Sequence, residues 1–152
     1  MTGFFGGSIA STSRVVTLDW STMEYTTHSP QLLMARIGSV CAVVKDKDGS
    51  AKVAIVGGTS KGIEFWNPAD GTVEQVSYQI PAEDGSSIGL THTQMLPIND
   101  GSEFILYSGY KVSHHKAIWR YNVAAKTWTK AGNVLTSRGE HVTLPVTGID
   151  CS

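Results

Sequence analysis

The hydrophobic positions of this chain fall into short apolar runs, each closed by a stretch rich in Gly, Asp, Asn or Ser. Residues 52–60, KVAIVGGTS, are the clearest example, because their apolar run stops at Gly57 and Gly58. Short runs bounded by turn-forming residues are typical of β-strands. A run that does not alternate apolar and polar positions is typical of a strand buried on both faces. The pattern therefore predicts an all-β fold built from short strands.

The glycine pair recurs along the chain. An apolar run in GFFGGS ends at Gly6 and Gly7, and another in FILYSGY ends at Ser108 and Gly109. Gly6 and Gly57 are 51 residues apart, and so are Gly57 and Ser108. Segments of like pattern at a constant period of this length indicate a repeat protein.

Each glycine pair is followed by an apolar or aromatic strand, an Asp or Asn, and a turn. A short polar side chain that caps its own turn, with a residue that returns to the core six positions later, predicts a hairpin. The three such pairs are Asp19 and Tyr25, Asn67 and Val73, and Asn122 and Trp128. In the second and third repeats, Asp48-Gly49 and Asp100-Gly101 predict a further tight turn ahead of the strand that ends at the glycine pair. Each repeat is thus expected to contain four short strands.

These features resemble the kelch repeat along nearly the whole chain. The shared elements are a double glycine, an aromatic residue close to an Asp or Asn, and an aromatic residue six positions further on. The third repeat matches best and the first matches least. Ser108 in place of a glycine and Val73 in place of the family's usual Trp depart from the pattern. The resemblance implies four-stranded blades of a kelch-type β-propeller, whereas the alternative, an antiparallel β-sandwich, would not require turns that repeat in phase.

The chain is expected to form one propeller unit over residues 1–152. The repeats are expected at residues 1–35, 36–86 and 87–137. Residues 138–152 resemble a leading strand, with Arg138 at the position that Arg36 holds in the second repeat, and are expected to complete the first blade. This gives about three blades, whereas closed propellers have about 4 to 8. We therefore expect a homodimer that closes a six-bladed ring; a fragment of a longer propeller and half of a heteromeric one are the alternatives.

The composition argues against two classes of binding partner. The 12 basic and 13 acidic residues nearly cancel, and no run of like charges stands out, so neither nucleic acid nor a membrane surface is expected to bind. No apolar stretch has the length of a membrane span, and the first residues lack the pattern of a signal peptide. The two cysteines are too few for a disulfide scaffold. The compartment stays open.

The histidines show no catalytic or metal-binding pattern. His114 and His115 are adjacent in a predicted loop, where solvated side chains are favoured over a ligand role. His92 and His141 are expected to hydrogen-bond to the backbone of neighbouring strands, and His28 is expected at the surface. No nucleophile, base and orienting group are recognisable. No catalytic residue, metal site or cofactor is therefore predicted.

Two stretches resemble ligand loops in part. Residues 46–50, DKDGS, share the opening of a calcium loop but lack its third acid and its distant Glu, so a hairpin turn is favoured. Residues 57–62, GGTSKG, lack the Gly-Lys-Ser/Thr of a phosphate loop. Cys41 is expected to be a small buried hydrophobe. Cys151 lies near the last residue, and the disulfide state of both cysteines stays open.

The resemblance favours a non-catalytic binding or scaffold module that recognises a protein partner. Loops on a rigid scaffold commonly carry function, so the loops between the second and third strands of two repeats are the expected binding surface. Their candidate residues are Thr59, Ser60 and Lys61, and Tyr110, Lys111, His114 and His115. The alternatives are a propeller that binds a carbohydrate or small ligand, and the remnant of a galactose-oxidase-like enzyme, whose copper motif is not found here.

Overall fold

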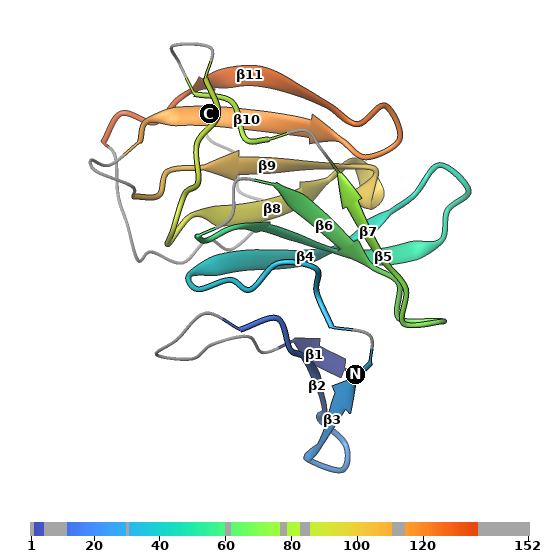
Figure 1. The fold of residues 1–152 in the computed structure, drawn as a ribbon. Helices are drawn as coiled ribbons and strands as arrows, with labels where there is room; N and C mark the ends of the chain where they lie inside the picture. The colour runs from blue at the N-terminus through green and yellow to red at the C-terminus, as the bar shows by residue number, and fades with distance from the viewer. Residues whose placement is uncertain are drawn as a thin grey trace.

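The computed structural model describes residues 2–4, 12–29, 31–59, 62–76, 79–82, 86–110 and 115–136. Within these residues the chain forms eleven β-strands and one short 3-10 turn, arranged in three antiparallel sheets (Figure 1). In this described part of the chain, no helix is long and apolar enough to cross a membrane. The prediction of an all-β fold is confirmed.

The first sheet has the order β1-β2-β3 and the other two sheets have four strands each. Its strands are β1 (Thr2–Phe4), β2 (Val15–Asp19) and β3 (Glu24–His28). The second sheet contains β4 (Ser39–Lys45), β5 (Ala51–Gly57), β6 (Ile63–Trp66) and β7 (Val73–Val76). The third contains β8 (Gln94–Ile98), β9 (Glu103–Tyr107), β10 (Ala117–Asn122) and β11 (Thr127–Asn133), with the 3-10 turn η1 (Asn99–Gly101) between β8 and β9.

In the second and third sheets the strands lie side by side in the order of the chain. Short connections favour this arrangement, because they return the chain antiparallel to the strand that it has just left. The four-strand interpretation of the second and third repeats is therefore confirmed. In the first sheet, three strands are described.

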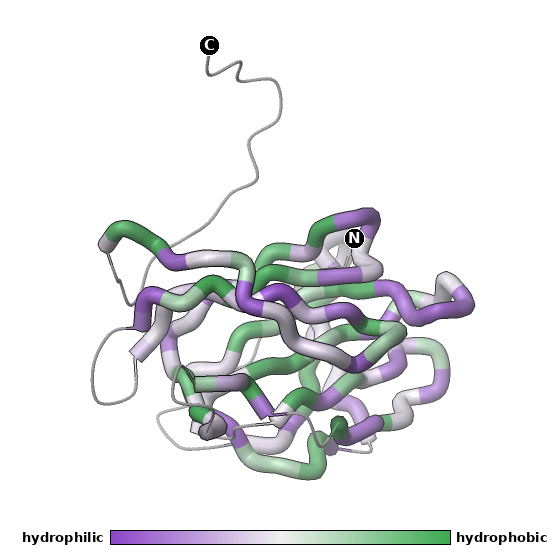
Figure 2. The backbone as a smooth tube through the Cα atoms, turned by 90° about the horizontal axis from the view of Figure 1, so that it is seen from above, coloured by the Kyte–Doolittle hydropathy of each residue, from purple (hydrophilic) through white to green (hydrophobic). Residues whose placement is uncertain are grey.

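The second sheet lies between the other two (Figure 1). All four residues of β6 and the last five of β5 are buried, on both faces of the sheet. In Figure 2, hydrophobic stretches lie along the strands inside the stack and hydrophilic ones are frequent in the outer turns. The absence of alternation in KVAIVGG therefore has the predicted cause, a strand covered on both sides.

The larger core cluster joins the second and third sheets. It holds fourteen buried residues: Val44, Ala54, Val56, Ile63, Phe65, Val76, Ile80, Ile88, Leu90, Met95, Phe104, Leu106, Tyr121 and Val123. The Tyr121 ring stacks on Phe104 with centroids 5.1 Å apart and meets Trp128 edge-on at 4.8 Å. Each fully buried large apolar side chain stabilises the fold by about 1.5–3 kcal/mol, so this cluster dominates the contact between the two sheets.

A smaller cluster joins the first and second sheets. It consists of Val15, Val53, Ile55 and Trp66, with Leu32, Cys41 and Val73 packed against it. His28 belongs to the same contact, because its ring meets Trp66 edge-on at 4.9 Å and its Nε2 lies 2.8 Å from Thr17 Oγ1. The expectation that His28 lies free at the surface is therefore wrong: it is half-buried between two sheets.

The Asp or Asn of each repeat caps its own turn as predicted. Asp19 Oδ1 accepts from the Ser21 amide at 2.8 Å, Asn67 Oδ1 from the Ala69 amide at 3.0 Å and Asn122 Oδ1 from the Ala125 amide at 2.8 Å. Four positions after each cap the backbone is left-handed. These residues are Met23 (φ 59°), Gly71 (φ 74°) and Lys126 (φ 55°). The turn geometry thus repeats even where the residue type does not.

The residue six positions after each cap has a less uniform environment. Trp128 and Val73 are half-buried against the two core clusters, as expected. Tyr25 is 68% exposed, so its predicted return to the core is wrong. Trp128 and Val73 each face an adjacent sheet that buries them. Tyr25 instead points to the face of the first sheet opposite to the face that packs on the second sheet.

Residues 46–50 form a hairpin turn. The Gly49 amide donates to the Asp46 carbonyl at 2.9 Å, and Asp48 Oδ1 accepts from the Ser50 amide, also at 2.9 Å. Gly49 has a φ of 82°, and at the corresponding turn of the third sheet Asp100 and Gly101 have φ values of 56° and 87°. The interpretation of these residues as a hairpin turn is confirmed.

Candidate binding face at the glycine end of the sheets

The strand β5 ends in two glycines that are required by their surroundings. Gly57 (φ 74°) would place a Cβ atom 2.5 Å from the Leu90 carbonyl oxygen, and Gly58 (φ 75°) would place one 2.7 Å from the Ile37 carbonyl oxygen. The Gly58 amide also donates to the Leu90 carbonyl at 2.7 Å. Only glycine combines a left-handed backbone with such close approach of a carbonyl oxygen from another segment. We call this end of the second and third sheets the glycine end.

The corresponding pair in the third sheet, Ser108 and Gly109, has the same backbone hand. Ser108 has a φ of 59° and is 2% exposed, and Gly109 has a φ of 107°. A Cβ atom on Gly109 would lie 3.1 Å from the Thr91 carbonyl oxygen. Thr91 and Tyr110 then close a bridge, with each amide donating to the other's carbonyl at 3.0 and 2.8 Å. Both pairs therefore form tight turns of the same backbone hand, and in the third sheet the first position of the pair holds the buried Ser108 side chain.

The glycine ends of the two sheets are joined to each other. The His92 amide donates to the Gly38 carbonyl at 3.1 Å, so the segment entering β8 is tied to the segment entering β4. Gly38 (φ 67°) and His92 (φ 54°) both have a left-handed backbone just before these strands. This bond comes from the main-chain amide of His92, and the expected hydrogen bond of its side chain stays a prediction. His141 lies outside the described residues.

A buried ion pair lies beneath this end. Arg36 is 3% exposed and Glu64, on β6, is 0% exposed. Arg36 Nε donates to Glu64 Oε2 at 2.8 Å, while Nη1 donates to the carbonyls of Gly57 and Gly62 at 2.8 and 3.0 Å. Glu64 Oε1 accepts from the Leu33 amide at 2.6 Å. The pair therefore connects the segment that enters β4 to the last residue of β5 and to the start of β6.

Sequence reasoning missed Glu64. The available signal was a carboxylate in the otherwise apolar strand IEFW, since a charge that is buried in this way is normally paired. Arg36 was noted only as the counterpart of Arg138, which lies outside the described residues. Pairing of residues 28 positions apart needs the register of the sheet, which composition and spacing do not supply.

The structure places three candidate binding residues at the glycine end. Thr59 is exposed and its Oγ1 donates to the Ala35 carbonyl at 3.4 Å. Tyr110 is 42% exposed, and the His115 amide donates to the Gly109 carbonyl at 3.0 Å. The remaining candidates and the first glycine pair lie outside the described residues: Ser60, Lys61, Lys111, His114, Gly6 and Gly7.

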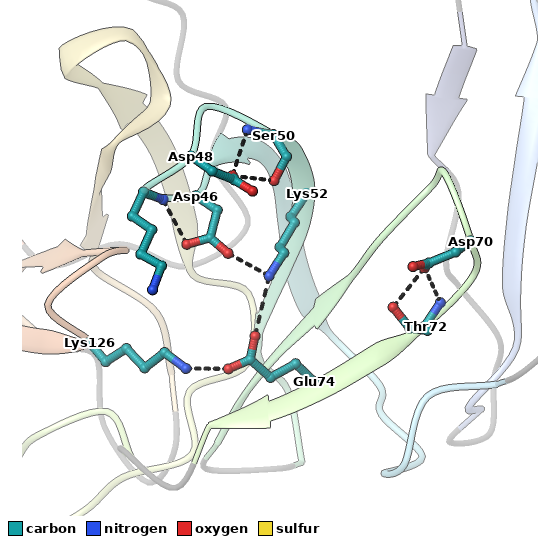
Figure 3. A network of polar contacts seen from close by, with 9 residues as sticks. Asp46, Asp48, Ser50, Lys52, Asp70, Thr72, Glu74 and Lys126 are labelled. Carbon is teal, nitrogen blue, oxygen red and sulfur yellow. Dashed lines mark hydrogen bonds and ion pairs between the residues drawn. The ribbon is translucent and has the colours of Figure 1, made fainter.

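The opposite end of the sheets carries a network of ion pairs (Figure 3). Lys52 Nζ lies 2.6 Å from Asp46 Oδ2 and 3.3 Å from Glu74 Oε2, and Glu74 also accepts from Lys126. The hydrogen bond from Lys52 holds the pKa of Asp46 below its ordinary value, and the same bond raises the pKa of Lys52. The bond from Lys126 lowers the pKa of Glu74. Because Lys126 belongs to the third sheet, this network joins two sheets.

Among the described residues, no group of three or more His, Cys, Asp or Glu side chains is placed to hold a metal ion. Cys41 is half-buried on β4, where burial raises the pKa of its thiol, which disfavours the reactive thiolate. Cys151 lies outside the described residues.

Comparison with known proteins gives a fold neighbour. No family model and no curated protein matches the chain. Among solved structures, the one titled "Structure of YjhT" superposes with a TM-score of 0.61 at 15% sequence identity. The match covers 91% of this chain and 49% of the YjhT chain, so this chain spans about half the length of that protein. At this identity the similarity shows a shared fold alone.

Proposed function

We propose that the three sheets are blades of a kelch-type β-propeller that acts as a non-catalytic binding module. Three observations support the propeller: sheets of strands in chain order, turn geometry that repeats at Met23, Gly71 and Lys126, and a middle sheet covered on both faces. In a propeller, neighbouring blades pack face to face around an axis. The chain also shares its fold with about half of the YjhT chain.

The binding surface that we propose is the glycine end, and its partner is a protein. The observation that carries this proposal is the convergence of connecting segments from two repeats. They are tied together by the Gly58–Leu90 and His92–Gly38 hydrogen bonds. A loop surface fixed in this way loses little conformational entropy on binding, which favours affinity.

The two ends of the sheets differ in what they offer a partner. At the glycine end, Tyr110 is 42% exposed and its backbone is held by two hydrogen bonds with Thr91. Tyrosine supplies a large contact area with a polar tip and is enriched in binding surfaces. At the opposite end, Lys52 and Lys126 are already engaged with carboxylates of the same chain. The glycine end is therefore the better candidate.

The experiment is a selection of peptide ligands from a displayed random library, followed by a glycan array. Binding of selected peptides should weaken at least tenfold in Tyr110→Ala and in Thr59→Ala. Lys47→Ala, which truncates an exposed side chain in the β4–β5 turn at the opposite end of the second sheet, is the control and should bind as the parent does. Selective glycan binding without peptide binding would replace the protein partner by a carbohydrate, and equal loss in the control would contradict the proposed face.

A further inference from the structure

The connection between the first and second sheets carries two exposed apolar side chains. Leu33 is 62% exposed and Met34 is 38% exposed. The connection between the second and third sheets instead buries its apolar residues in the larger core cluster, as Ile80, Ile88 and Leu90 show. Because scattered apolar residues are common on protein surfaces, exposure alone assigns no role. The way in which the backbone of Leu33 and Met34 is held sets them apart, and we call these two residues the apolar patch.

The buried carboxylate of Glu64 anchors the backbone of the apolar patch. Its Oε1 accepts from the Leu33 amide at 2.6 Å and from the Met34 amide at 3.3 Å, while its Oε2 is bound by Arg36 Nε. Apolar side chains that replace a buried ion pair often cost the fold no stability. Such a replacement would not, however, supply acceptors for the two amides. The ion pair therefore does something that apolar packing could not do, because it fixes the backbone that carries the apolar patch.

Two further contacts join the apolar patch to the glycine end. Gln75, on β7, donates from Nε2 to Met34 Sδ at 3.4 Å. Thr59, which follows the glycine pair of β5, donates from Oγ1 to the carbonyl of Ala35 at 3.4 Å. Because Thr59 is one of the candidate binding residues, the apolar patch adjoins the binding surface proposed above.

We propose that the apolar patch binds an uncharged, aliphatic or aromatic side chain of a peptide segment in the protein partner. This inference rests on the binding role proposed for the glycine end and adds the chemistry that the partner must present there. The partner's side chain packs on Leu33, the more exposed of the two residues, and Met34 adapts to its shape through an unbranched thioether. Since the backbone of the apolar patch is fixed before binding, the contact costs little conformational entropy.

The groups around the apolar patch select this kind of partner. The side chains of Arg36 and Glu64 are 1% and 0% exposed and neutralise each other, and the two polar side chains that contact residues 34 and 35 are uncharged. A charged side chain placed on the apolar patch would therefore lose water without gaining an opposite charge from these groups.

The same contacts decide the mode of binding. The amides of Leu33 and Met34 already donate to Glu64, so a partner cannot pair with them as an added strand. Neither residue has an aromatic ring on which a sugar could stack. Contact through an apolar side chain is what the apolar patch offers, and this favours a peptide over a carbohydrate.

The test uses peptides selected on the full parent chain from a displayed random library, with binding measured by isothermal titration calorimetry. Leu33→Ser should stay folded, as judged by circular dichroism, and should weaken binding at least about tenfold, because the buried contact of a Leu side chain is removed. Leu33→Met keeps the apolar volume and should bind within about threefold of the parent. Val43→Ser is the matched control, since Val43 is 61% exposed but lies within β4, away from the glycine end; it should bind as the parent does.

The anchoring by Glu64 has a test of its own. The double variant Arg36→Met/Glu64→Leu leaves no buried charge and should stay folded. It should bind the selected peptides more weakly than the parent, with a less favourable entropy of binding, because the backbone of residues 33 and 34 must then be ordered by the partner. Binding with the affinity and entropy of the parent would overturn the anchoring.

The outcomes separate this inference from the binding role of the glycine end. Peptides that share an apolar residue, and that lose affinity for Leu33→Ser, would support the apolar patch. Peptides that lose affinity for Tyr110→Ala but bind Leu33→Ser like the parent would overturn the apolar patch and leave the glycine end as the binding surface. Selected peptides that share a charged residue instead, or an equal loss in Val43→Ser, would also overturn it. A parent chain that selects no peptide would overturn both proposals.

Discussion

Gly57 and Gly49 share a left-handed backbone but not the same surroundings. A Cβ atom on Gly57 would lie 2.5 Å from the Leu90 carbonyl oxygen, whereas one on Gly49 would meet nothing within 4 Å. Both substitutions by alanine carry the cost of a left-handed backbone, about 1–2 kcal/mol. Only the substitution at position 57 also forces β5 away from the segment that contains Leu90.

We therefore expect Gly57→Ala to lower the free energy of unfolding by at least about 2 kcal/mol more than Gly49→Ala, because backbone overlap cannot be relieved by moving a side chain. Urea denaturation of the two variants and the parent measures the difference. Equal losses would mean that the close approach of the Leu90 carbonyl is relieved at no cost.

Arg36 and Glu64 should behave as a unit. Removing one partner leaves the other charge buried, so Arg36→Met and Glu64→Gln are each expected to lower the free energy of unfolding by about 3–5 kcal/mol. The double variant should lose clearly less than the sum of the two, because it leaves no unpaired charge. Denaturation midpoints of the four proteins complete the cycle, and additive losses would show that the two side chains act independently.

At the scale of the element, the turn between β10 and β11 reaches the neighbouring sheet through Lys126. The pKa values of Glu74 and Asp46 are lowered in the folded chain. Their contribution to stability is therefore complete above the unfolded pKa of about 4 and is lost as the pH falls through the folded pKa. Lys52, with its raised pKa, contributes fully below about pH 10 and loses that contribution at more alkaline pH.

Lys126→Met should consequently destabilise the chain at pH 6 and less at pH 3, because the contribution of the ion pair is lost as the pH falls through the lowered pKa of Glu74. The expected difference at pH 6 is about 0.2–1 kcal/mol, as for other partly exposed pairs. Urea midpoints at the two pH values measure it. Lys47→Met, at an exposed position of the β4–β5 turn, is the control, and a difference that persists unchanged at pH 3 would exclude the ion pair as its cause.

The strands and turns of the second and third sheets were predictable from local pattern. The apolar run before Gly57, the capping residues Asn67 and Asn122 and the turn at Asp48 act within a few residues of themselves, so spacing is enough to recognise them. The exposure of Tyr25 was not predictable, because its side chain has the same local context as Trp128 and differs only in what lies across from it.

The candidate site was predictable only as a set of loops. The positions of Thr59 and Tyr110 follow from the glycine pairs that precede them. The Arg36–Glu64 pair and the Lys126–Glu74 contact join residues 28 and 52 positions apart. They depend on how sheets pack, which a single sequence does not encode in its spacing.

At the scale of the whole molecule, stability should be highest in the middle of the stack. The second sheet is covered on both faces by the two core clusters, whereas four of the five residues of β3 are exposed. Amide hydrogens in β5 and β6 should exchange with solvent only when the whole chain unfolds. Those in β3 should exchange through local opening, which has a far lower free energy.

Hydrogen exchange followed by mass spectrometry should accordingly show β5 and β6 as the slowest strands and β3 as faster by at least about tenfold, which corresponds to roughly 1.4 kcal/mol. The partly buried strand β11 serves as an intermediate reference. Equal protection of β3 and β5 would mean that the three sheets open together.

The burial of β5 on both faces has a consequence for the chain before it folds. Residues 53–57, VAIVG, carry no charge and favour β-structure, which is the composition of segments that assemble into amyloid. During synthesis from the N-terminus, the third sheet emerges last, so Ala54 and Val56 stay uncovered until it arrives. Protection of this segment from aggregation therefore depends on residues made 48 to 67 positions after Ala54 and Val56, such as Phe104 and Tyr121. Ribosomal stalling in that interval would release a chain in which this aggregation-prone strand is exposed.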